Sequence, residues 1–208
     1  MCFIDGAHAL GQLPISLRTL NPDFYAGTFN KWMYTPRGCA ILYIKKEFQQ
    51  LIKPVVECIG YKQDLQTKFF YQGTRDDSPY IVAKDAIEFY NDIGGHEKIL
   101  KYVEPLLNNA VKHLTQAWGT SSLSIPKSME APFMRMIKLP AASVFKGRKE
   151  FFDLAPLMVD HMKQHNITPL YSVLGGQIYI RICANIYNSE DDYVKLGSLI
   201  CGLMKQVE

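Results

Sequence analysis

The sequence has few cysteines, no cluster of basic residues and no long apolar run, and each of these absences excludes a class of protein. Its five cysteines are widely spaced without a C-x-x-C pair, which argues against a disulfide framework and against a zinc or other structural metal site. The 23 basic and 20 acidic residues are scattered, so no run of lysines and arginines could follow a phosphate backbone. Nucleic acid is therefore not expected as a partner.

Membrane insertion and secretion are not expected either. The longest apolar run, CAILYI at 39–44, is far too short to span a bilayer. The opening residues, MCFIDGAH, have neither the basic region nor the apolar region of a secretory signal. Because the cysteines also suit a reducing compartment, the sequence predicts a cytoplasmic protein without membrane contact.

What the sequence does contain is a set of alternating strand and helix patterns. At 208 residues and 48% hydrophobic, it can bury a sizeable core. Short apolar runs predict strands at 2–4, 23–28, 39–44, 131–139 and 177–183. Apolar spacings of three and four residues predict helices over 79–92, about 96–118 and about 149–165, and a final helix opened by Ser189 with Asp192 in a capping box. Pro105 should kink the second helix or mark its true start.

This order of strands and helices predicts an α/β fold that is divided into domains. We expect residues 1–95 to form part of an α/β domain, residues 96–120 to form a connecting helix, and residues 121–208 to form a small α+β domain.

Lys31 stands out because of its surroundings in GTFNKWMYTPRGCAILYI, residues 27–44. Most lysines are solvated surface groups. This one follows a predicted strand and lies among Phe29, Trp32, Met33 and Tyr34, so we expect it to be partly desolvated. Desolvation favours the neutral amine, and Lys31 is therefore a candidate Schiff-base nucleophile.

Asp5 and His8 form the second element, in FIDGAH. An aspartate that ends a strand often caps the helix that follows. It can also point into the cleft at the carboxyl ends of parallel strands, where open α/β sheets bind ligands. The residues alone leave both alternatives open.

The combined stretch DGAH…DFYAGTFNKWMYTPRGCAILYI resembles the class V aminotransferase group of fold type I enzymes, which depend on pyridoxal 5'-phosphate. That group includes cysteine desulfurases, selenocysteine lyases and isopenicillin N epimerase-like proteins. The resemblance implies that Lys31 is the Schiff-base residue and moves the α-proton, that Asp5 pairs with the pyridinium nitrogen, and that His8 contacts the ring hydroxyl. It also implies that Thr28 donates to the phosphate. Asn30 departs from the usual histidine and brings a hydrogen-bond donor without positive charge.

Gly73 and Thr74, in YQGTRDDSP, match a Gly-Thr pair of the same family. In that family the threonine reaches the phosphate of the neighbouring subunit, so the resemblance implies a homodimer. The alternative is an ordinary polar turn that caps the following helix.

Arg181 lies in GGQIYIRICANIYN, where isoleucines alternate with polar residues, so it should leave the strand on the face opposite the isoleucines. An arginine there can bind a carboxylate with its fork of donors. The segment is similar to the family's R-x-S-x-x-x-Y-N segment, whose arginine binds the substrate carboxylate, with Cys183 in place of serine and Tyr187-Asn188 intact. A lone strand arginine is otherwise more often a surface residue.

The resemblance covers only the second half of such an enzyme and leaves two classes of function open. The first is a pyridoxal-phosphate enzyme that acts on an amino acid, with sulfur-containing amino acids as candidate substrates and with lyase chemistry preferred over epimerase and transaminase chemistry. No cysteine occurs between Cys58 and Cys183, which disfavours a persulfide-forming desulfurase. The second is a truncated, non-catalytic interaction protein. The cost of burying Lys31 near Asp5 would count against it.

Overall fold

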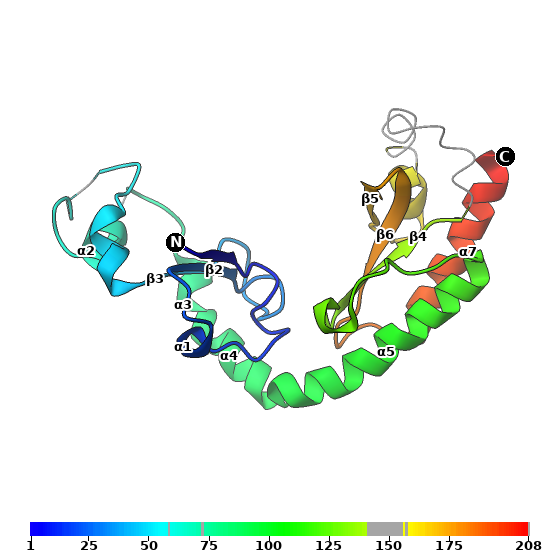
Figure 1. Cartoon of the computed structure of the whole chain (residues 1–208), viewed down its shortest axis with the longest axis horizontal. Coiled ribbons are helices and arrows are strands. Elements are labelled where there is room, and N and C mark those ends of the chain that lie inside the picture. Colours follow the sequence, from blue (N-terminus) through cyan, green and yellow to red (C-terminus); the bar gives the residue numbers. More distant parts are fainter. Residues whose placement is uncertain (58, 72, 141–155, 157, 208) are drawn as a thin grey trace. The chain divides into compact units, whose positions relative to one another are not determined.

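The computed structural model describes residues 1–57, 59–71, 73–140, 156 and 158–207. The chain divides into two compact units, Met1–His96 and Glu97–Glu208, whose elements are labelled in Figure 1. Part of the helix expected over about 149–165, residues 149–155 and 157, lies outside the described residues, while 156 and 158–164 are helical.

The first unit contains a three-stranded sheet. Strand β1 (Phe3–Asp5) pairs in parallel with β2 (Phe24–Thr28), and β2 pairs antiparallel with β3 (Ala40–Ile44). These are the three strands that the short apolar runs predicted. Because β1 and β2 run in the same direction, their carboxyl ends, at Asp5 and Thr28, lie at the same edge of the sheet.

Short helices complete the first unit: α1 (Leu17–Leu20), the 3-10 helix η1 (Lys46–Leu51), α2 (Leu65–Phe70), α3 (Ser78–Ile81) and α4 (Ala83–Asp92). The helix predicted over 79–92 is present but divided at Val82. The ψ of Val82 is 1°, far from a helical value, so one residue interrupts the regular turn. The core of this unit includes Tyr25, Trp32, Cys39 and Tyr90.

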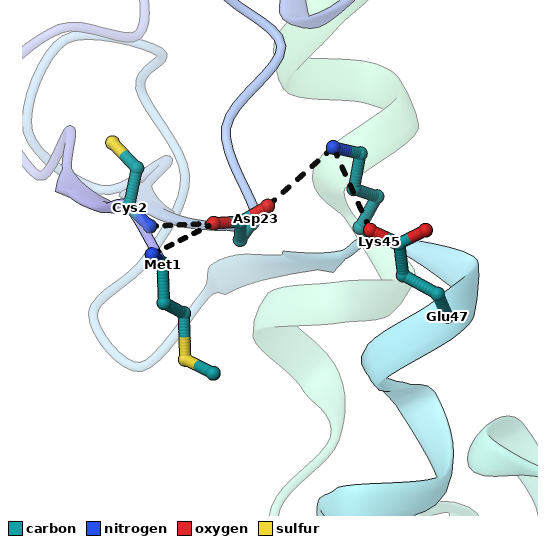
Figure 2. A network of polar contacts seen from close by, with 5 residues as sticks. All are labelled: Met1, Cys2, Asp23, Lys45 and Glu47. Carbon is teal, nitrogen blue, oxygen red and sulfur yellow. Dashed lines mark hydrogen bonds and ion pairs between the residues drawn. The ribbon is translucent and has the colours of Figure 1, made fainter.

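Asp23 ties together the three strands of this sheet (Figure 2). Its Oδ2 accepts a hydrogen bond from the backbone N–H of Cys2 at 2.6 Å, and its Oδ1 lies 3.4 Å from the Lys45 Nζ. Lys45 Nζ also lies 3.8 Å from Glu47, and the amine of Met1 lies 3.8 Å from Asp23. The hydrogen bond from Cys2, with a smaller contribution from Lys45, lowers the pKa of Asp23 below its ordinary value of 3.8.

Asp23→Asn is therefore expected to reduce stability at neutral pH and not in acid. A carboxyl whose pKa is lower in the folded state stabilises the fold above its unfolded pKa, and that contribution is lost as the pH falls through the folded pKa. Urea denaturation at several pH values should give free energies of unfolding for wild type and variant that become equal below pH 3.8, the ordinary pKa of an aspartate. Asp92→Asn, a change at an exposed acid, is the control. A deficit of Asp23→Asn that stays constant down to the lowest pH would contradict the role of the charge.

The second unit is an antiparallel sheet with two long helices. Strands β4 (Met134–Lys138), β5 (Leu170–Leu174) and β6 (Gln177–Cys183) lie in the order β4-β6-β5. The helices are α5 (Gly95–Trp118) and α7 (Glu190–Val207), and a 3-10 turn, η2 (Lys127–Met129), lies between α5 and β4. Ile178, Ile180 and Ile182 form the buried face of β6. Strand β5 was not predicted from the sequence.

Helices α5 and α7 pack against each other, as Figure 1 shows. The indole N–H of Trp118 donates to the Gly197 carbonyl at 3.1 Å, and a side chain at Gly197 would come within 3.3 Å of Leu114. Pro105 lies inside α5, so it does not mark the start of that helix. One of the two bonds of the predicted capping box is present, because Asp192 accepts from the Ser189 N–H at 3.0 Å.

Candidate active site

The loop after β1 and the turn after β2 contact each other at the shared edge of the sheet. The Thr28 hydroxyl donates to the Ala7 carbonyl at 2.7 Å, and the Trp32 indole N–H donates to His8 Nδ1 at 3.4 Å. The buried Gln12 donates to the His8 carbonyl at 2.6 Å and fixes the backbone there. These bonds bring the Asp5–His8 segment and the Thr28–Lys31 segment to one place.

Two glycines permit this close approach. A Cβ on Gly6 would overlap the ring of Tyr25. Gly11 has φ +81°, and a Cβ there would lie 2.7 Å from the carbonyl oxygen of Trp32. Larger residues would push the two segments apart, so glycine is needed at positions 6 and 11 for the local geometry.

Asp5 ends β1 and is exposed. Its Oδ1 accepts from the Ala7 N–H at 3.0 Å, which holds a tight turn rather than capping a helix. Burial and, to a smaller extent, the charge of Asp5 raise the pKa of the nearby Tyr25. One carboxylate oxygen therefore shapes the loop, while Oδ2 makes no hydrogen bond with the described residues and can accept one from a ligand.

His8 is half-buried beside Trp32, with the two ring centroids 6.3 Å apart. Because Nδ1 accepts from the indole, the neutral imidazole carries its proton on Nε2. His8 can thus present a donor to an oxygen atom. Trp32 was not identified from the sequence as a partner of His8. The available signal was an aromatic residue directly after Lys31.

Lys31 is exposed, and the expectation that it is desolvated was wrong for this chain. Trp32 is 7% exposed, so the turn directs the tryptophan inward and leaves the adjacent lysine outside. No described residue forms a hydrogen bond or ion pair with the Lys31 amine. Since Asp5 is exposed too, the cost of burying these charges does not discriminate between an enzyme and a non-catalytic protein.

Asn30 and Thr74 are the remaining predicted contacts in this unit. Asn30 is half-buried in the turn before Lys31. Thr74 lies apart, in an exposed turn after Gly73, which has φ +114°. Next to it, Asp76 accepts from the Ser78 N–H at 2.9 Å at the start of α3, so the helix-capping alternative describes this turn as well. Thr74 makes no hydrogen bond within the described part of the chain.

Arg181 belongs to the other unit, on the face of β6 opposite the isoleucines, as predicted. Its Nε is buried and has no hydrogen-bond partner among the described residues. The side chain lines a cavity of about 190 Å³ whose other walls are mainly apolar. They include Leu123, Ile125, Met129, Met134 and Met136.

Among the described residues, no acid forms an ion pair with Arg181. Glu130, the acid in its wall, pairs with Arg135 at 2.9 Å. Burial raises the pKa of the adjacent Cys183 thiol, and Arg181 offsets this only in part, so the thiol is protonated near neutral pH. The cavity can accept an anionic group. Its methionines were not identified from the sequence, although Met134 and Met136 alternate along a predicted strand.

The first unit's residues fit the chemical groups of pyridoxal phosphate. A carboxylate suits the pyridinium N–H, an imidazole N–H suits the ring hydroxyl, and an accessible amine suits the aldehyde. Thr28 already donates to Ala7, so its hydroxyl proton would have to turn to reach a phosphate oxygen. Among the described residues, no group of three His, Cys, Asp or Glu side chains could hold a metal ion, and none of the helices is long and apolar enough to cross a bilayer.

Comparison with known proteins gives a consistent result. Residues 1–196 match the family model described as aminotransferase class-V. The chain is 26% identical over 211 residues to hercynylcysteine sulfoxide lyase of Schizosaccharomyces pombe, covering 95% of this chain and 50% of that protein. It is 30% identical over 215 residues to putative L-cysteine desulfhydrase 1 of Oryza sativa subsp. japonica, covering 95% and 44%. It is also 22% identical to isopenicillin N epimerase of Amycolatopsis lactamdurans, covering 97% and 52%.

Solved structures share the fold. The apo cysteine desulfurase of Thermococcus onnurineus NA1 aligns with a TM-score of 0.75 at 18% identity, over 98% of this chain and 52% of that one. The protein C-DES, with glycine covalently linked to its pyridoxal-phosphate cofactor, aligns with a TM-score of 0.65 at 19% identity, over 94% and 50%. The chain thus spans about half the length of the proteins that it matches.

Proposed function

We propose that this chain, which belongs to the aminotransferase class-V family, takes part in pyridoxal-phosphate-dependent cleavage of a carbon–sulfur bond in an amino acid. Family membership and the shared fold indicate pyridoxal phosphate as the cofactor, the one expected from the sequence. The observation that carries the proposal is the contact between the Asp5–His8 loop and the Thr28–Lys31 turn. Two of the relatives named above are a lyase and a putative desulfhydrase, which supports C–S cleavage.

Each residue of this edge has a proposed role. The Lys31 amine would hold the cofactor through its aldehyde, and the Asp5 carboxylate would hold the pyridinium proton. His8 donates to the ring hydroxyl, and Thr28 and Asn30 contact the phosphate. The bound cofactor supplies an electron sink for the substrate Cα. Thr74 would reach the phosphate of a second subunit, so we also propose a homodimer.

Arg181 is proposed to bind the substrate carboxylate. Its buried Nε has no hydrogen-bond partner and its charge no counter-ion among the described residues, which favours a forked pair with an anion. The thioether and aliphatic walls of the cavity suit an apolar or sulfur-bearing group better than a charged one.

Once the substrate amine had replaced it at the cofactor aldehyde, the freed Lys31 amine would be the base that takes the α-proton, and the sulfur group could then leave Cβ. Residues 59–182 contain no cysteine, so the sulfur would leave as a sulfide or thiol and not as a persulfide on a protein cysteine. We therefore propose lyase chemistry in preference to epimerase and transaminase chemistry. The cytoplasmic location remains a prediction.

The direct test is reductive trapping. The purified 208-residue chain is mixed with pyridoxal phosphate, reduced with borohydride, digested and analysed by mass spectrometry. We expect a pyridoxyl group on Lys31 in preference to the other lysines, because Lys31 lies in the turn whose residues Thr28 and Trp32 bond to the loop that carries Asp5 and His8. Labelling spread over many lysines, or none, would instead support the non-catalytic alternative.

A further inference from the structure

A second cavity lies in the first unit, formed by residues of η1, the segment that follows it and α2. Its volume is about 680 Å³, within the range of small-molecule pockets. Four lysines line it: Lys46, Lys53, Lys62 and Lys68. None of the residues assigned above to the cofactor or the substrate lines this cavity.

Lys68 is the unusual member of this group, because it is only 9% exposed. Lysine is rarely buried without a partner, since removing an ammonium group from water is costly. Its Nζ donates to the Gln49 carbonyl at 3.2 Å, which uses one of its three protons. Within the described part of the chain no carboxylate pairs with it. The ammonium therefore has donors left for a ligand in the cavity.

The two acids in the wall do not neutralise the lysines. Asp64 caps α2, because its Oδ1 accepts from the N–H groups of Gln66 at 3.0 Å and Thr67 at 3.2 Å. Its Oδ2 accepts from the Thr67 hydroxyl at 2.6 Å, and these hydrogen bonds lower the pKa of Asp64. Glu57 is exposed. Four lysines against two acids, one of them engaged at a helix end, give the cavity a positive potential.

The wall that holds Lys68 is closely packed. A Cβ on Gly60 would lie 2.8 Å from the Cα of Lys68 and would overlap the carbonyl of Thr67, so only glycine lets this segment approach α2. Lys62 lies over the Tyr61 ring, with its Nζ 5.3 Å from the ring centroid. Contacts within the fold thus help to fix the positions of Lys62 and Lys68 in the wall of the cavity.

From these observations we propose that the cavity is a binding site for a small dianion, a phosphate-bearing molecule or a small dicarboxylate, with Lys68 as its principal contact. The site is separate from the proposed cofactor site and does not depend on the proposed function.

Calorimetric titration at low ionic strength tests the proposal, with inorganic phosphate and succinate as probes and chloride as the control anion. Saturable binding of phosphate alone, of succinate alone or of both supports the site. The result also shows whether the cavity binds phosphates, dicarboxylates or both. Lys68→Met keeps the apolar stem and should weaken binding about tenfold or more, since a charge-assisted hydrogen bond is lost. Lys62→Gln, at an exposed position, should weaken it less. Lys84→Met, at a side chain that is 82% exposed outside the cavity, is the matched control and should bind like wild type.

Amide shifts in NMR spectra separate this site from the cofactor's phosphate contacts. Phosphate should shift residues 46–53 and 61–68. Shifts confined to residues 5–8 and 28–31 would overturn the proposal, as would wild-type affinity in Lys68→Met or the absence of saturable binding of both probes.

Discussion

Lys31→Ala is expected to abolish pyridoxyl labelling at this site and the visible absorbance of the bound cofactor. Loss of the amine removes both the covalent attachment and the base that takes the α-proton. Under the proposed function, the rate of sulfide or thiol release from a sulfur-containing amino acid should therefore fall by at least about a hundredfold. Because Lys31 is exposed and contacts no described partner, the free energy of unfolding should change by no more than about 0.5 kcal/mol.

Three measurements on the same preparation check this result: the absorption spectrum with cofactor, the rate of sulfide release, and the urea midpoint. Lys84→Ala is the control, since it removes another exposed lysine of the same unit. An absorbance band that persists in Lys31→Ala at one cofactor per chain would show that another lysine holds the cofactor.

Arg181→Gln is expected to lower kcat/KM for the amino-acid substrate by at least about thirtyfold, close to 2 kcal/mol, because a buried carboxylate–guanidinium pair is lost. The loss should lie mainly in KM. Arg181→Lys keeps the charge but not the fork, so it should recover only part of the loss.

Labelling of Lys31 by the cofactor separates carboxylate binding from a general structural effect. Neither Arg181 variant should change this labelling, because all proposed cofactor contacts of this chain lie in the first unit. Arg18→Lys, at an exposed arginine, should leave both readouts unchanged. Wild-type kcat/KM in Arg181→Gln would exclude the carboxylate role.

The parts of the fold that follow from local patterns could be predicted from the sequence. The three strands of the first unit are apolar runs between turn residues, and the face of Arg181 follows from strand alternation. Strand β5 escaped prediction because its residues are only half-buried or exposed, which leaves no strong alternation. Val82 divides a helix whose apolar spacing continues on both sides, so periodicity alone could not locate the break.

The candidate active site, too, could be predicted from the sequence only in part. The family resemblance selected Asp5, His8, Thr28 and Lys31, and the structure brings the two segments that carry them together. The burial of Lys31 was mispredicted, because aromatic neighbours in sequence need not surround a side chain in space. The Trp32 contact to His8 depends on a turn geometry that no short pattern specifies.

The division of the chain into two compact units also has an evolutionary consequence. Under the proposed function, the cofactor residues of this chain are in Met1–His96, and the arginine for the substrate is in Glu97–Glu208. Each unit has its own core, so mutations that reshape the methionine-lined cavity need not destabilise the loops around Lys31. A lineage could therefore change the amino acid that it degrades while it inherits its cofactor chemistry unaltered.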